Sequence, residues 1–156
     1  MTVYTFEGQV KKGEKGENIL DIFYIKRYRI LQVSMELQKL GIDRIWIDEK
    51  IGFRHFVEYK TDFTAANTNK IFIETISVDK ENKLGWAITS CARFLVIYVP
   101  TKISYVAHME AIHFYLRDWQ NLYEKKVIEN KSYFTIGICV PINIFERICC
   151  EINKLE

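Results

Sequence analysis

The stretch Phe56-Val-Glu-Tyr-Lys-Thr-Asp62 decides how the fold is interpreted. Apolar and charged residues alternate in it, as they do when strand side chains point to opposite faces of a sheet. Val57 and Tyr59 therefore point into the core. Glu58 and Lys60 share the other face, where two charges are costly to bury unless they meet a metal or a substrate. The stretch predicts a core strand that carries a polar site.

A hairpin brings a third charged residue to this strand. Residues 42–47 read as one strand, 48–52 as a turn and 53–60 as the second strand. Asp43 opens the first strand, so the hairpin can place it beside Glu58. Two neighbouring carboxylates make a site for Mg²⁺ together with phosphate oxygens.

The acid-x-lysine pattern alone is not specific. It recurs in predicted turns and polar stretches, at Asp48/Lys50, Glu81/Lys83, Glu124/Lys126 and Glu129/Lys131. There a charged pair is a solvated surface. Glu58/Lys60 differs because it lies on a predicted strand, where the competing interpretation is an exposed ion pair at a strand edge.

The neighbouring segments complete an α-β-β-β-α-β order. The glycine-containing stretch 7–20 reads as a loop or short lead-in, and the chain turns helical from Glu17 until Gly41 ends the helix. The hairpin is followed by a third strand at 71–77, a short helix at 86–92 and a fourth strand at 93–99. Later elements are a strand at 103–107, a helix at 109–122, a strand at 133–140 and a last helix after Pro141.

Composition indicates one ordered domain without a membrane span. The chain has 156 residues, of which 49% are hydrophobic, and a net charge of +2, which excludes a disordered chain. No apolar run approaches the roughly 18 residues of a transmembrane helix, and the first residues do not form a signal peptide. The four cysteines lack zinc-site spacing, which favours buried, reduced thiols. We therefore expect a cytoplasmic protein with no membrane partner.

Asp43 followed by Glu58-Tyr-Lys60 in this order of elements resembles the PD-(D/E)xK nuclease superfamily, which includes restriction endonucleases and archaeal-type Holliday junction resolvases. The resemblance covers about residues 17–99 and extends to phage and bacterial members. It implies a single α/β (α+β) domain over 1–156, with a mixed central sheet flanked by helices and β/α additions at 100–156. Ile42 stands where many members have proline.

The resemblance implies a Mg²⁺-dependent DNA endonuclease that hydrolyses phosphodiester bonds, with Mn²⁺ as a possible substitute. Asp43, Glu58 and the Tyr59 carbonyl would bind the metal. Lys60 would orient or help to deprotonate the attacking water and would stabilise the charge that develops on the phosphate. No Gly-x-Ser-x-Gly elbow or Cys/His pairing supports a nucleophilic side chain instead.

Further acidic residues are candidates for the same site. Many members of the superfamily have a glutamate on the first helix that completes the metal site. Glu17 is the preferred match, with Glu36 and Asp21 as alternatives. Glu74 interrupts the apolar strand at 71–77, so it is either another carboxylate at the edge of the site or an exposed residue near the strand end.

Candidate DNA contacts lie in two polar stretches. Lys26, Arg27 and Arg29 form a basic cluster that could bind phosphates or form a solvated helix face. Thr64, Asn67 and Lys70 follow the Glu58 strand and could contact a phosphate backbone. The net charge of +2 argues against a nucleic-acid partner unless the cations flank one acidic pocket.

Two other functions remain open from the sequence. The fold could have lost its metal and bind DNA or a protein partner, and the separation of the Asp43 and Glu58 oxygens would distinguish this case. Alternatively, the aromatic residues, 14% of the chain, could form the interface of a dimerising structural domain. A homodimer is also what the resemblance implies.

Overall fold

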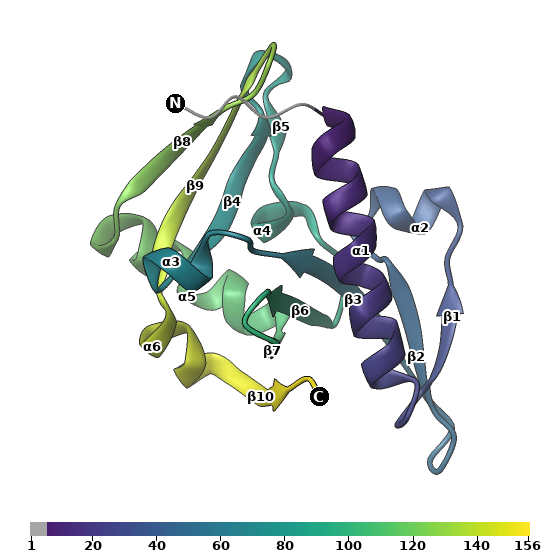
Figure 1. Cartoon of the computed structure of the whole chain (residues 1–156). Helices are drawn as coiled ribbons and strands as arrows, with labels where there is room; N and C mark the ends of the chain where they lie inside the picture. The colour runs from purple at the N-terminus through teal and green to yellow at the C-terminus, as the bar shows by residue number, and fades with distance from the viewer. Residues whose placement is uncertain (1–5) are drawn as a thin grey trace.

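The computed structural model describes residues 6–156 and has an α/β fold built on two β-sheets (Figure 1). Residues 1–5, which include most of the segment considered as a signal peptide, lie outside this description. The central sheet has the order β1-β2-β3-β6-β7-β10: β1 (Arg29–Gln32), β2 (Arg44–Asp48), β3 (Phe53–Thr61), β6 (Phe94–Val99), β7 (Ile103–His108) and β10 (Cys149–Lys154). It is mixed, because β3 and β6 are parallel and the other neighbours are antiparallel.

The second sheet is antiparallel and has the order β5-β4-β9-β8. Its strands are β4 (Lys70–Val78), β5 (Lys83–Leu84), β8 (Lys125–Glu129) and β9 (Phe134–Pro141). The helices are α1 (Phe6–Tyr24), α2 (Met35–Lys39), α3 (Ala65–Thr68), α4 (Trp86–Thr89), α5 (Met109–Leu122) and α6 (Ile142–Phe145), with 3₁₀ turns η1 (Asp79–Glu81) and η2 (Glu146–Ile148).

Two hydrophobic clusters hold these layers together on opposite faces of the central sheet. On one face, Leu20 and Tyr24 of α1 pack with Val57 and other residues of the sheet. On the other face, Leu95 of β6 packs with Ile73 of the second sheet and with residues of α4 and α5. The molecule is therefore a single α/β domain with a mixed central sheet flanked by helices, which confirms the predicted fold class.

The α-β-β-β-α-β order is present, but one strand differs from the prediction. The order is formed by α1, by β1, β2 and β3 of the central sheet, and then by α4 and β6, with α2 between β1 and β2 and with α3, β4, η1 and β5 between β3 and α4. Residues 71–77 do form a strand, β4, but this strand belongs to the second sheet. The first strand of the core is β1, which lies inside the segment predicted to be helical.

The predicted helix from Glu17 to Gly41 is wrong in its extent. α1 begins at Phe6 and ends at Tyr24, so the whole stretch 7–20 that was expected to be a loop is helical. A side chain at Gly16 would collide with Thr61 of β3. Glycine in a helix costs roughly 1 kcal/mol relative to alanine, and here the close packing of α1 on β3 offsets that cost.

The C-terminal segment also departs from the prediction. The last helix is one turn, α6, and the chain then forms η2 and the edge strand β10. Ile152 lies in the segment expected to be helical, but it belongs to β10, where its side chain is half exposed. Cys91 and Cys150 are exposed, so the expectation of buried thiols is correct in part only, and none of the four cysteines forms a disulfide.

Within residues 6–156, no helix is both long enough and apolar enough to cross a membrane.

Gly41 lies just after α2 and is a sensitive point of the fold. Its φ is +73°, and a Cβ atom would lie 2.9 Å from the Ser90 Cα. We expect Gly41→Ala to lower the free energy of unfolding in urea by about 2 kcal/mol, from backbone strain and the collision together. Gly52→Ala is the matched control, because Gly52 has a φ of +66° but open space around it. Equal losses in the two variants would show that the contact with Ser90 is unimportant.

Candidate active site

Glu58 and Lys60 lie on one face of β3, as the alternation predicts. The Lys60 Nζ is 2.8 Å from Oε1 of Glu58. The Glu58 side chain is 2% exposed and that of Lys60 is 37% exposed, so the pair runs from the interior towards the surface. Val57 and Tyr59 on the opposite face are buried in the cluster with α1. This geometry differs from an exposed ion pair at a strand edge, because the carboxylate is inside the protein.

Asp43 lies beside this pair because of where β2 begins. The β2–β3 register ends at Arg44↔Val57, and the Asp43 main-chain N–H still donates to Val57 O at 2.8 Å. The next main-chain donor of β3, Tyr59 N, donates instead to Oδ2 of Asp43 at 2.8 Å. The N–H and C=O of a strand residue face the same neighbour. The Tyr59 carbonyl therefore also faces the Asp43 end of β2.

The Glu58 carboxyl is in an environment that suits a bound cation. Burial raises the pKa of Glu58, the Lys60 ammonium and the nearby Ser90 hydroxyl oppose this shift, and Asp43 adds to it. Oε2 of Glu58 is buried and has no hydrogen-bond partner within the described structure. The neighbouring Ser90 hydroxyl donates to Gly41 O at 2.9 Å. A buried carboxylate oxygen without a partner is costly, and a metal ion would remove that cost.

Lys60 remains a cation in this environment. Burial lowers the pKa of Lys60, but the carboxylates of Glu58 and Asp43 more than reverse this effect, and Glu74 adds to the increase. The net result is a pKa above the usual range of lysine. Lys60 therefore places a positive charge between the buried carboxylate and the solvent.

Arg44 of β2 links two acidic residues of α1, Glu17 and Asp21, to the site. The Arg44 side chain is 7% exposed and binds Glu17 at 3.0 Å and Asp21 at 3.0 Å. Burial raises the pKa of Glu17, Asp43 adds to the increase, and Arg44 and Lys60 oppose it. Glu17 is thus within electrostatic reach of both Asp43 and Lys60.

The three candidates for the acidic residue on the first helix lie at different places relative to the site. Glu17 is on the part of α1 that lines a pocket containing Lys60. Asp21, one turn further along, binds the Nε of Arg44 at 3.1 Å. Glu36 is exposed on α2, a separate helix.

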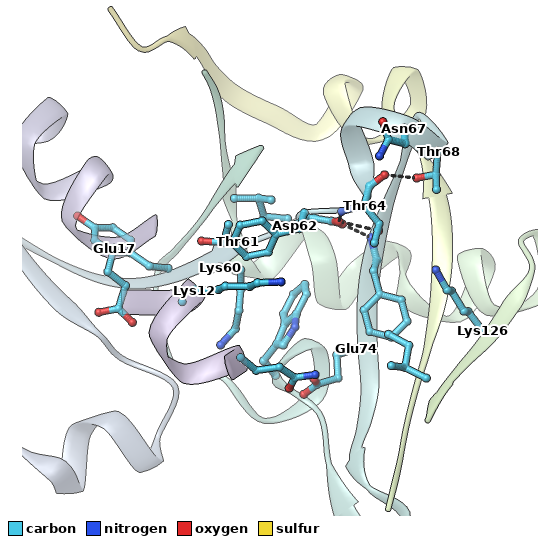
Figure 2. A pocket seen from close by; sticks show the side chains of 18 of the residues that line it. Lys12, Glu17, Lys60, Thr61, Asp62, Thr64, Asn67, Thr68, Glu74 and Lys126 are labelled. Carbon is cyan, nitrogen blue, oxygen red and sulfur yellow. Dashed lines mark hydrogen bonds between the residues drawn. The ribbon is translucent and has the colours of Figure 1, made fainter. Parts of the chain in front are cut away.

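Lys60 opens into a pocket of about 890 Å³ between α1 and the second sheet (Figure 2). Figure 2 shows Lys12 and Lys60 between Glu17 on α1 and Lys126 on the opposite wall. Four other predicted site residues line the same pocket, namely Tyr59, Thr64, Asn67 and Glu74. Glu74 thus lies at the edge of the site and is half-buried.

The predicted basic cluster lies elsewhere. Lys26, Arg27 and Arg29 follow the C-terminal end of α1, whereas the pocket is lined by α1 residues between Gln9 and Glu17. Arg27 binds Glu151 at 2.8 Å, and the Arg29 Nε lies 3.2 Å from Glu49. Lys70 is 3.6 Å from Glu124 and is not among the residues that line the pocket. These four cations do not surround the acidic residues.

Sequence reasoning did not select Arg44 or Lys126, and Lys12 is noticeable in the sequence only as one of the lysines at positions 11, 12 and 15. Arg44 follows the pattern of a strand residue that points inward with Trp46, and a cation at such a position signals a buried ion pair. Lys12 and Lys126 line the pocket from segments more than 100 residues apart. Nothing local in the sequence connects them.

Carboxylate and carbonyl oxygens are the ligands that Mg²⁺ prefers, and Mg²⁺ commonly uses only one or two carboxylates besides water and phosphate oxygens. Asp43, Glu58 and the Tyr59 carbonyl fit that requirement. Among residues 6–156, no three acidic, histidine or cysteine side chains are grouped closely enough to hold an ion by themselves. The arrangement suits a metal that is shared with a phosphate ligand.

Comparisons with known proteins identify the fold. No family model matches the chain, and no curated protein matches it. Among solved structures, the chain is similar to a bacterial homing endonuclease, I-Ssp6803I, with a TM-score of 0.52 and 17% sequence identity. The match covers 68% of this chain and 72% of that one. The chain therefore has a fold similar to that of a bacterial homing endonuclease.

Proposed function

We propose that this protein is a Mg²⁺-dependent DNA endonuclease of the PD-(D/E)xK type, which hydrolyses phosphodiester bonds with a metal-activated water. The observation that carries the proposal is the buried Glu58 carboxylate, which has an unpartnered oxygen and lies beside Asp43 and Lys60. Groups of this kind with shifted pKa values are typical of catalytic sites. The fold similarity to an endonuclease supports the same conclusion.

Each residue then has a role that its environment supports. Asp43, Glu58 and the Tyr59 carbonyl would hold Mg²⁺, or Mn²⁺ in its place. The ion would polarise the phosphate and activate water for attack. Lys60, held as a cation by its neighbours, would stabilise the negative charge that develops on the phosphate oxygens. Glu17, positioned by Arg44, would supply a further carboxylate near the metal.

Purified protein should cleave DNA in Mg²⁺ or Mn²⁺ and should lose this activity in EDTA. Branched, duplex and single-stranded DNA should all be tested, since the active site alone does not select among them. Absence of metal-dependent cleavage on every substrate would refute the proposal.

A non-catalytic protein that binds DNA or a protein partner is the second candidate. The 2.8 Å ion pair between Glu58 and Lys60 favours it, because this contact partly compensates the buried carboxylate without a metal. In that case metal would neither stabilise the protein against heat nor change its binding to DNA. Thermal unfolding with and without Mg²⁺ therefore separates the two candidates.

Binding to single-stranded DNA should depend only weakly on salt. Three lysines line the pocket, Lys12, Lys60 and Lys126. Each neutralised phosphate of a single strand contributes roughly −0.7 to the slope of log K against log[salt], so we expect a slope of about −2. The measurement is fluorescence anisotropy in EDTA over a range of KCl concentrations. A slope steeper than about −5 would show that a larger basic surface takes part, such as Lys26 to Arg29.

A further inference from the structure

The pocket wall beyond Lys60 contains two aromatic rings that are not packed in the hydrophobic core. Phe63 and Phe72 line the pocket, and neither belongs to the two clusters of buried hydrophobic residues. Phe63 is 43% exposed and lies just before α3. An exposed phenylalanine has a cost in water. Two rings facing the same cavity indicate a ligand with a flat, apolar surface.

The second sheet presents one face to the core and the other to this pocket. Along β4, Ile71 and Ile73 are fully buried in the core, whereas Phe72 and Glu74 alternate with them and line the pocket. The Phe72 ring lies against Gly137 of the neighbouring strand β9. The pocket wall is therefore part of the rigid sheet.

Asp62 fixes the position of both rings relative to Lys60. Its Oδ1 accepts hydrogen bonds from Thr64 N at 3.0 Å and Ala65 N at 3.0 Å, which hold the turn that contains Phe63. Its Oδ2 accepts from Phe72 N at 2.9 Å, at the start of β4. One carboxylate, two residues after Lys60, thus joins the strand of the proposed catalytic lysine to both aromatic residues. A site held in this way is preorganised.

The charged side chains around the two rings indicate where a phosphate and a base would bind. The lysines favour a phosphate, and the glutamates favour a base. The Lys12 Nζ lies 5.5 Å from the centre of the Phe63 ring, and Lys12 lines the same pocket as Lys60 (Figure 2). Glu74 and Glu129 also line the pocket. Their carboxylates repel phosphate but can accept hydrogen bonds from the amino groups of bases.

We infer that this pocket binds one unpaired nucleotide of the DNA substrate, with its base stacked on Phe63 and Phe72 and a flanking phosphate near Lys12 and Lys60. The inference rests on the proposed function, because it places that nucleotide next to the phosphate to be cleaved. The volume of about 890 Å³ is within the range of small-molecule sites and is large enough for a nucleotide. A paired base would first have to unpair and leave its stack, which costs free energy that an unpaired base does not pay. The preferred substrate is therefore single-stranded DNA or DNA with an unpaired nucleotide at the cleavage site.

The test is binding to fluorescein-labelled DNA in EDTA, where no cleavage occurs. Wild-type protein should bind a single-stranded oligonucleotide more tightly than a blunt duplex of equal length. Phe63→Leu keeps an apolar side chain but removes the aromatic face, so it should weaken single-strand binding about tenfold and leave duplex binding unchanged. Phe63→Trp should retain single-strand binding. Phe114→Leu is the matched control, because Phe114 is 77% exposed on α5.

Two results would overturn the inference. One is equal affinity of the wild-type protein for the single strand and the duplex. The other is an equal effect of Phe63→Leu on both DNAs, or no effect on either. Phe72→Leu provides a second variant if Phe63→Leu does not fold.

The failure of this inference is distinguishable from the failure of the proposed function. If Mg²⁺-dependent cleavage occurs but Phe63→Leu has no strand-specific effect, the nuclease proposal stands and the nucleotide pocket is wrong. If Phe63→Leu has the strand-specific effect but no metal supports cleavage, the pocket stands and the enzyme proposal is wrong.

Discussion

Glu58→Gln and Lys60→Met should each lower the rate of Mg²⁺-dependent DNA cleavage by at least about a hundredfold, the usual effect of removing one group that stabilises a transition state. Glu58→Gln keeps the shape of the side chain but removes the negative charge that would bind the metal. Lys60→Met keeps the length of the side chain and removes the positive charge near the phosphate. The measurement is single-turnover cleavage at saturating protein, so that weaker DNA binding does not mimic the effect.

The chain contains a matched control for both variants. Glu81 and Lys83 have the same acid-x-lysine spacing and are exposed, on η1 and β5. Glu81→Gln and Lys83→Met make the same changes of charge and should leave cleavage unchanged. Cleavage by Glu58→Gln at the wild-type rate would show that the buried carboxylate does not take part in catalysis.

Arg44→Met should lower the free energy of unfolding by about 3 kcal/mol at neutral pH, because it removes the cation from a buried ion pair and leaves carboxylates without compensation. The Arg44 side chain is 7% exposed, and its partners Glu17 and Asp21 are 33% and 23% exposed. Because these two carboxylates are partly exposed, we expect a loss of unfolding free energy at the lower end of the range for breaking a buried ion pair. Urea unfolding measures it, with exposed Arg117→Met on α5 as the control.

The cost of Arg44→Met should depend on pH. The pKa of Glu17 is already raised in the folded protein by burial and by Asp43. When a carboxyl has a higher pKa in the folded protein than in the unfolded protein, its protonated form stabilises the fold at a pH below the unfolded-state pKa. This stabilisation is lost as the pH rises through the folded-state pKa. Removing Arg44 raises the pKa of Glu17 further. The difference in stability between variant and wild type should therefore be small near pH 4, grow as the pH rises and level off near neutrality. A difference that does not change with pH would mean that packing, not charge, explains the loss.

The part of the fold that holds the catalytic candidates could be predicted from the sequence. The alternation of Val57, Glu58, Tyr59 and Lys60 defines β3 because its apolar positions match one buried face. The turn at 48–52 then sets an antiparallel hairpin, and that pairing brings Asp43 to Tyr59 N. Both inferences rely on residues that are close in sequence.

The elements around this hairpin could not be assigned correctly, because distant contacts decide them. Apolar side chains repeat at a helical spacing at Ile30, Val33, Leu37 and Leu40, yet residues 29–32 pair with β2 as a strand. Gly16 disfavours a helix locally, but α1 continues through it because the helix packs closely on Thr61. The position of β4 in a second sheet depends on its pairing with β9, more than 60 residues later.

The same reason explains which site residues were missed. Lys12 and Lys126 reach the pocket from α1 and β8, so only the three-dimensional fold brings them together. The cluster at Lys26 to Arg29 was conspicuous in the sequence because its cations are adjacent. In the structure Arg27 and Arg29 bind nearby acidic side chains.

The measurement that tests the central claim most directly is the anomalous scattering of crystals soaked in Mn²⁺. We expect one strong peak between the Asp43 and Glu58 carboxylates, with the Tyr59 carbonyl oxygen among the ligands. Binding there should break or lengthen the 2.8 Å contact between Lys60 and Glu58. A well-diffracting soaked crystal with no peak at this position, or with Mn²⁺ bound only elsewhere, would contradict the proposed metal-dependent active site.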